Sequence, residues 1–242
     1  MASVFTAPMI GRESELAQCA ALLDRRGPAL VLVSSDAGVG KSRFLQGLAE
    51  SSAPAGWTVL PASGQGELSV GPATTQSEFT ARIRHMLGLP ASGDPLQGRA
   101  TLQVAAPGLA RQLAARSPVL LLIDGYRPSA SCAAWFERQL MPDVRRAGAP
   151  VVFALAEVPD QLSGCMERAA PELVIRLGHL LPETVRSHLE QACRVVEPPL
   201  TDDELGRYSR AVSRDPELLQ ALVSVLCLGS TDAPGARGGV DA

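Results

Sequence analysis

The chain has 242 residues, with 22 basic and 25 acidic side chains and a formal net charge of −3. This balance and the low aromatic content of 4% disfavour direct nucleic-acid binding, which calls for basic patches and stacking platforms. Apolar runs fall short of the roughly 20 residues that cross a bilayer, and no signal peptide is visible, so we expect a cytoplasmic protein without a membrane partner. Five cysteines without C-x-x-C spacing fit a reducing compartment.

In chain order, the apolar periodicity predicts alternating helices and strands over residues 1–180. Helices are expected at about 10–26, 41–51, 76–88, 98–116 and 129–147. Strands are expected at about 29–34, 57–61, 118–124, 150–156 and 173–177. Strands that are apolar throughout and alternate with helices are typical of a parallel sheet covered on both faces. The fold class is therefore α/β, a P-loop sheet flanked by helices.

After residue 181 the pattern changes to helices alone, at about 182–194, 201–212 and 215–228. Thr201 followed by Glu204 is the signature of a helix N-terminal capping box. We expect residues 181–228 to form a small helical lid subdomain. The Gly-, Ser- and Ala-rich residues 229–242 are expected to be a disordered tail.

The most informative stretch is Ser35-Asp36-Ala37-Gly38-Val39-Gly40-Lys41-Ser42, between an apolar strand and a helix. In a P-loop, backbone N–H groups surround the phosphates, the lysine reaches the outer phosphates and the hydroxyl binds magnesium. Lys41 is the only lysine, whereas the other 21 basic residues are arginines. A compact ammonium fits among phosphate oxygens better than a planar guanidinium. Ser35 stands where the consensus has its first glycine.

Asp124 ends the most apolar of the expected strands, at 118–124. A P-loop site needs a carboxylate at the end of a second buried strand to hold the magnesium ion with its waters. Asp124 fits that role, with Ser42 as the other protein ligand of the metal. A turn residue in an Asp-Gly pair is the alternative interpretation.

Together these residues resemble the STAND ATPases of the AAA+ superfamily, the nucleotide switches of signal-transduction proteins such as LuxR-type large regulators. Gly11-Arg12-Glu13-x-Glu15-Leu16, about 30 residues before the P-loop, is similar to the opening motif of that family. The resemblance continues through the strands at 118–124 and 150–156 to Ser213-Arg214-Asp215-Pro216, similar to the Gly-x-Pro segment of the lid. It covers almost all of residues 8–228.

The resemblance implies an adenine nucleotide, ATP or ADP, bound with Mg²⁺. Ile10, Gly11 and Arg12 would lie at the adenine edge, and Pro216 would pack on the base. Lys41 and Asp124 would carry the phosphate and metal chemistry. The residues implied around the phosphates are Asp36, Ala37, Gly38, Val39, Gly40, Lys41, Ser42 and Arg43. Arg12 could instead be a surface helix-start residue, and Pro216 the first residue of a helix.

The chain departs from the family pattern at four places, and the first two departures predict nucleotide binding without fast hydrolysis. Gly125 replaces the acidic residue that polarises the attacking water, and Val158 replaces an arginine that senses the γ-phosphate. Arg214-Asp215 replaces the glycines before the lid proline, and Ser35 replaces a P-loop glycine. Positioned bases and charges are each worth orders of magnitude in phosphoryl transfer.

Three functions stay open on this evidence. The first is a nucleotide switch, impaired in hydrolysis, whose partners are an effector or sensor domain or further copies of the chain. The second is an active ATPase with a substitute base, for which Glu157 at the end of a central strand is the candidate. The third is a non-hydrolysing scaffold for protein–protein interaction.

Overall fold

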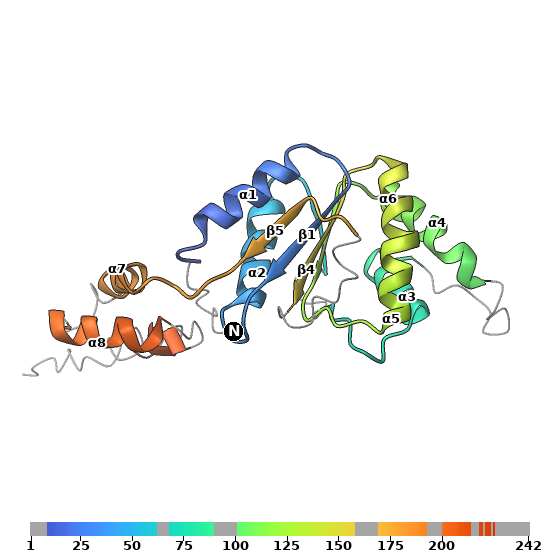
Figure 1. Ribbon diagram of the computed structural model, residues 1–242. Coiled ribbons are helices and arrows are strands. Elements are labelled where there is room, and N and C mark those ends of the chain that lie inside the picture. The colour runs from blue at the N-terminus through green and yellow to red at the C-terminus, as the bar shows by residue number, and fades with distance from the viewer. Residues whose placement is uncertain are drawn as a thin grey trace, which may run out of the picture. The chain divides into compact units, whose positions relative to one another are not determined.

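The computed structural model describes most of the chain (Figure 1). The described residues are 9–61, 68–89, 101–157, 169–192, 200–213, 218–219, 221–223 and 225. Contacts divide the chain into two compact units, each of which is described separately. The sheet unit consists of Arg12–Ala37 and Lys41–Leu177, and the helical unit consists of Met1–Gly11, Gly38–Gly40 and Gly178–Ala242.

The sheet unit is built on five parallel strands in the order β2-β3-β4-β1-β5. Their bounds are β1 Ala29–Ser34, β2 Thr58–Leu60, β3 Val119–Ile123, β4 Val151–Glu157 and β5 Leu173–Arg176. β4 lies between β1 and β3, with Val31 opposite Ala154 and Leu121 opposite Phe153. The expected α/β architecture with a parallel sheet is confirmed.

Helices cover both faces of this sheet, which is why every residue of the central strands is buried and why all of them are apolar except Ser34 and Glu157 at the strand ends. In Figure 1, α1 (Glu13–Leu23) and α2 (Lys41–Ser52) lie on one face. The helices of the other face are α3 Gln76–Met86, α4 Thr101–Ala114, α5 Ala130–Trp135, the π-helical segment η2 Phe136–Leu140 and α6 Met141–Ala147. Among the described strands, the edge strand β5 alone exposes a large apolar residue, Val174.

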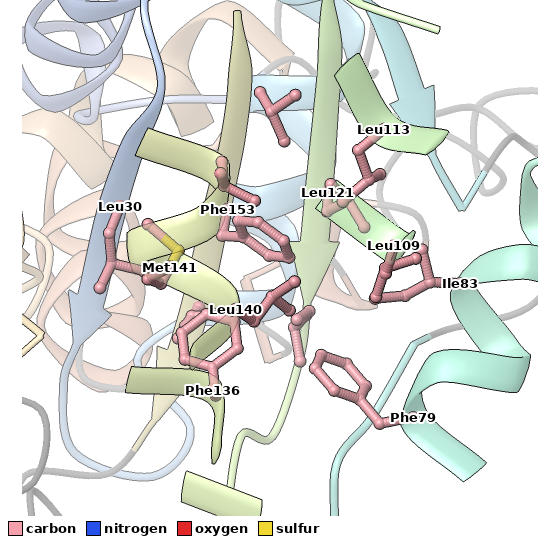
Figure 2. Close-up of a cluster of buried hydrophobic side chains, with 14 of the residues drawn as sticks. Leu30, Phe79, Ile83, Leu109, Leu113, Leu121, Phe136, Leu140, Met141 and Phe153 are labelled. Carbon is pink, nitrogen blue, oxygen red and sulfur yellow. The ribbon is translucent and has the colours of Figure 1, made fainter. Parts of the chain in front are cut away.

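The larger core of the sheet unit fills the space between the sheet and α3–α6, as Figure 2 shows. Phe136 packs edge-on against Phe153 of β4 with ring centroids 5.2 Å apart, and Phe79 packs edge-on against Trp135 at 6.1 Å. Aromatic pairs in this geometry add about 0.5–1.5 kcal/mol beyond the burial of their area. The core therefore fixes β3 and β4, the two strands whose ends carry Asp124 and Glu157.

The structure differs from the sequence prediction within the helix expected at 129–147. That helix is divided by η2, in which the Met141 N–H donates to the Phe136 carbonyl five residues back. Pro142 has no N–H to donate, so the backbone before it adopts the wider π-type bonding. The first helix begins at Glu13 rather than Ile10 because Gly11 adopts a positive φ of 65°. A capping box at Thr75 and Glu78 starts α3 and was not predicted.

The helical unit contains α7 (Pro182–Ala192) and α8 (Asp202–Val212), and the capping box predicted at Thr201 and Glu204 is confirmed. Its apolar core consists of Leu180, Val185, Leu189, Leu205, Val212, Leu219 and Val223. Of the helix expected at 215–228, only residues 218–219, 221–223 and 225 are described, and they are helical. The expected tail, 229–242, lies outside the described residues. No described helix is both long enough and apolar enough to span a membrane.

Candidate nucleotide-binding site

Three neighbouring strands of the sheet unit end in polar residues at the same edge of the sheet, which is the one formed by the carboxyl ends of the strands. β1 ends at Ser34, which pairs with Glu157 at the end of β4, and Asp124 follows the last residue of β3. Parallel strands bring their carboxyl ends to one edge of a sheet, which is where ligands bind in open α/β folds. The residues that the sequence singles out as chemical therefore converge on this edge.

The loop between β1 and α2 has the backbone of a phosphate-binding turn. Gly38 and Gly40 have φ angles of 78° and 98°, a region that residues with a Cβ rarely adopt. A Cβ at Gly38 would meet no atom within 4 Å, so the backbone conformation, rather than lack of space, requires glycine there. α2 begins at Lys41, directly after this turn. The N-terminus of a helix attracts anions through its free N–H groups and its dipole.

The ammonium of Lys41 is held by the start of its own loop. Nζ donates to the Ser35 carbonyl at 3.0 Å, to Ser35 Oγ at 3.1 Å and to the Asp36 carbonyl at 2.9 Å. Ser35 is buried, and its hydroxyl also bonds the Asp36 carbonyl at 2.9 Å. The serine that departs from the P-loop consensus is therefore a partner of the P-loop lysine.

Charged side chains near Lys41 shift its pKa and so show which residues lie close to it. Burial lowers the pKa of the Lys41 ammonium, and the carboxylates of Asp124 and Asp36 oppose that shift. Asp124 is therefore close enough to act on the lysine, as the sequence analysis requires of a strand-end carboxylate. The Asp124 backbone is fixed by its N–H, which donates to the Leu68 carbonyl at 3.0 Å.

Asp124 and Ser42 fit the donor set of a magnesium site. Both offer oxygen, the ligand type that Mg²⁺ prefers, and Ser42 is the exposed second residue of α2. Among the described residues, no group of three or more His, Cys, Asp and Glu side chains could hold a metal alone. A magnesium ion here would depend on phosphate and water oxygens for its remaining ligands, as is usual for this ion.

The position expected to carry the water-polarising acid is a glycine with a left-handed backbone. Gly125 has a φ of 65°, so a glutamate at this position would be strained even though its Cβ would meet nothing within 4 Å. Tyr126 follows, and its N–H donates to the Ala156 carbonyl at 2.9 Å. The turn that carries Asp124 and Gly125 therefore lies beside the end of β4.

Glu157, the last residue of β4, is the buried carboxyl group of this edge. It is 2% exposed, and its Oε1 has no hydrogen-bond partner among the described residues. Burial raises the pKa of this carboxyl to about 7. An ionised carboxylate without a partner is costly in such a place, so the group exchanges its proton near neutral pH instead of remaining charged.

Arg127 is a residue of this edge that sequence analysis missed. Its N–H donates to the Val70 carbonyl, and its side chain is exposed without a carboxylate partner among the described residues. Its charge lowers the pKa of Lys41, so the two cations lie in one neighbourhood. The available signal was its place three residues after the strand-ending Asp124.

The residues expected at the adenine edge fall in different units. Ile10 packs against the core of the helical unit, where a Cβ on Gly11 would approach Thr184 Cγ2 to 2.9 Å. Arg12 belongs to the sheet unit, where it is buried and pairs with Glu15 at 3.5 Å. Pro216, with Arg214-Asp215 and Val158, lies outside the described residues. Their roles around a base stay predictions.

The other residues implied around the phosphates lie in or directly after the loop. Asp36 and Ala37 are exposed, whereas Val39 is buried. The Arg43 guanidinium pairs with Glu50 along α2 at 3.3 Å. Arg43 thus pairs with a residue of its own helix, whereas Lys41 donates hydrogen bonds to the loop.

Comparison with known proteins supports the fold and leaves the family open. No family model matches the chain, and no curated protein matches its sequence. Among solved structures, the Aeropyrum pernix ORC2 protein (ADPNP-ADP complexes) aligns with a TM-score of 0.55 at 14% identity, over 98% of this chain and 72% of that chain. The Thermotoga maritima RuvB Holliday junction branch migration motor aligns with a TM-score of 0.58 at 15% identity, over 89% of this chain and 61% of its own.

The Escherichia coli MS115-1 HORMA:CdnC:Trip13 complex contributes a third likeness, with a TM-score of 0.56 at 14% identity. The match covers 94% of this chain and 84% of that chain. At such identities these three likenesses show the fold alone, a parallel α/β sheet flanked by helices.

Proposed function

We propose that this chain is an adenine-nucleotide-binding switch module of a signal-transduction or transcription-regulating ATPase, with slow ATP hydrolysis. The observation that carries the proposal is the arrangement around Lys41. The only lysine of the chain lies at the start of a helix, where loop carbonyls accept its hydrogen bonds and the preceding glycines have positive φ. The strand-end carboxylate Asp124 is close enough to act on its pKa. This combination suits a chain of phosphates better than any other ligand class.

In the proposed site, Gly38–Ser42 surround the phosphates with backbone N–H groups, and Lys41 exchanges its loop carbonyls for the outer phosphate oxygens. Asp124 and Ser42 hold a magnesium ion, which would neutralise phosphate charge. Ile10, Gly11, Arg12 and Pro216 are assigned to the adenine by resemblance alone. The nucleotide would act on a partner, either an effector or sensor domain or further copies of the chain.

Slow hydrolysis is proposed because two groups that accelerate phosphoryl transfer are missing from their usual positions. Gly125 carries no acid, and Val158 is not an arginine. The scaffold function without nucleotide is the alternative, but it leaves the bonded Lys41 and the nearby Asp124 without a purpose.

The test is to denature the purified chain and identify any released nucleotide by chromatography, and to measure thermal stabilisation by ATP and ADP with Mg²⁺. We expect either nucleotide at near one equivalent, or stabilisation of the nucleotide-free protein by added nucleotide. An empty chain that ATP does not stabilise would favour the scaffold function.

A further inference from the structure

Among the described residues, Glu157 is a strongly buried carboxyl group at the carboxyl ends of the strands, and the proposed switch does not use it. It is 2% exposed, and among the described residues nothing donates to its Oε1. Buried polar atoms in native proteins almost always have a partner, protein or water, so an unpartnered one calls for an explanation. A water molecule or a bound ligand would supply that partner.

The place of Glu157 on the sheet connects it to the site. It pairs with Ser34, the residue before Ser35, whose oxygen atoms hold Lys41. On its other side, the Tyr126 N–H donates to the Ala156 carbonyl, which brings the Asp124-Gly125 turn against the end of β4. Glu157 therefore stands between the strand that leads into the P-loop and the strand that ends in Asp124.

We propose that Glu157 supplies, from the end of β4, the water-orienting carboxylate that position 125 lacks, and is the catalytic base of slow ATP hydrolysis at this site. The inference rests on the proposed function, because it requires a bound nucleoside triphosphate. Gly125 precedes Tyr126 and Glu157 follows Ala156, so the two positions are next to each other on neighbouring strand ends. A carboxylate can reach the same water from the adjacent strand without the strain that a side chain at Gly125 would bear.

The step is an ordinary hydrolysis. Glu157 accepts a hydrogen bond from a water molecule, whose oxygen forms a bond to the γ-phosphorus. The bond from that phosphorus to the β–γ bridging oxygen breaks, and its electron pair leaves with ADP. The proton of the water passes to the Glu157 carboxylate and then to solvent. The burial that raises the pKa of this group to about 7 also makes its ionised form a stronger proton acceptor than an exposed glutamate.

Two variants separate this role from a structural one, Glu157→Gln and the shorter carboxylate Glu157→Asp. The matched control is Glu172→Gln, because Glu172 lies at the opposite end of β1, where its Oε2 accepts from the Leu30 N–H at 2.7 Å. Binding of ATP with Mg²⁺ is measured by calorimetry. Phosphate release is measured in a single turnover across pH, with Lys41→Ala to exclude a contaminating ATPase.

We expect the wild type and Glu172→Gln to release phosphate slowly, at a rate that rises through about pH 7 as Glu157 ionises. Glu157→Gln should bind ATP within a few-fold of the wild type, lose at least roughly tenfold in phosphate release and lose the pH dependence, and Glu157→Asp should retain part of the rate. Equal release by Glu157→Gln and wild type, or binding without any release by the wild type, would overturn the inference and leave the switch intact. Absence of ATP binding by the wild type would overturn both.

Discussion

Lys41 Nζ donates a hydrogen bond to Ser35 Oγ at 3.1 Å, and the same serine offers its carbonyl at 3.0 Å. The residue that breaks the P-loop consensus is thus bonded to the residue that defines it. These hydrogen bonds hold the lysine side chain at the start of the turn. The departure from the consensus therefore supplies the lysine with a side-chain partner.

We expect Ser35 and Lys41 to be energetically coupled. Ser35→Ala removes a hydroxyl that accepts from Lys41 and donates to Asp36, so it should lower the free energy of unfolding by about 1 kcal/mol. In a Lys41→Ala background the same change should cost less, because the shared bond is already gone. A double-mutant cycle from denaturant unfolding measures this coupling, and strictly additive effects would contradict it.

Replacing Glu157 should increase stability at high pH. The pKa of this carboxyl rises on folding from 4.5 to about 7, so the folded state binds the proton more tightly than the unfolded state. Its contribution is favourable at low pH and is lost as the pH rises between about 4.5 and 7. At pH 8, Glu157→Gln should therefore have a higher melting temperature than wild type and a free energy of unfolding that is larger by up to roughly 3 kcal/mol. At pH 4 the two proteins should differ little.

Thermal unfolding of the two proteins between pH 4 and pH 8 measures this difference. Glu172→Gln is the contrasting variant, because the Glu172 carboxylate is paired with Arg145 at 2.8 Å and its loss should lower stability. A Glu157→Gln protein that is less stable at pH 8 would indicate that the carboxylate has a stabilising partner when charged.

Magnesium should lose its effect on nucleotide binding when Asp124 is replaced. Asp124→Asn keeps the shape of the side chain but removes the charge that would attract the ion, so affinity for ATP with Mg²⁺ should fall roughly tenfold or more. Affinity for ATP with EDTA should change little. Calorimetric titrations with and without Mg²⁺ make the comparison, and Asp24→Asn, an exposed aspartate after α1, is the control. An unchanged response to Mg²⁺ would remove Asp124 from the metal site.

Arg127 should favour the more highly charged nucleotide. Its guanidinium acts on Lys41 and has no carboxylate partner among the described residues, so Arg127→Ala should weaken ATP binding by roughly five- to tenfold and ADP binding by less. Arg116→Ala is the matched control, because this exposed arginine precedes β3 at the opposite edge of the sheet. Competition titrations with both nucleotides measure the effect, and equal losses for ATP and ADP would contradict it.

Much of the fold follows from local sequence signals. The strand at 29–34 and the helix start at Lys41 are placed to the residue, because a fully apolar run and a glycine turn are unambiguous signals. The interruption of the 129–147 helix depends on how the backbone accommodates Pro142, which periodicity does not reveal. The strand order also cannot be read from local sequence signals, because the position of β4 between β1 and β3 is set by tertiary packing.

The site is predictable where one residue carries the signal and less so where neighbours create it. The involvement of Lys41 and Asp124 was expected from motif and strand end, and the charge relationship between them is present. The hold of Ser35 on Lys41 and the proximity of Arg127 arise only when the loops fold together. The strand-end position of Glu157 is visible in the sequence, whereas its burial and the Oε1 without a partner among the described residues are properties of the packed structure.

In the proposed function, Lys41 binds the outer phosphates of a nucleotide. The most direct measurement is chromatography of the nucleotide released on denaturing the purified protein, together with calorimetric titration of the nucleotide-free protein by ATP, for wild type, Lys41→Ala and the control Arg116→Ala. We expect adenine nucleotide at near one equivalent, or ATP binding, in the wild type and in Arg116→Ala, and neither in Lys41→Ala. A wild-type protein that carries no nucleotide and binds no ATP, or a Lys41→Ala protein that binds as well as wild type, would contradict it.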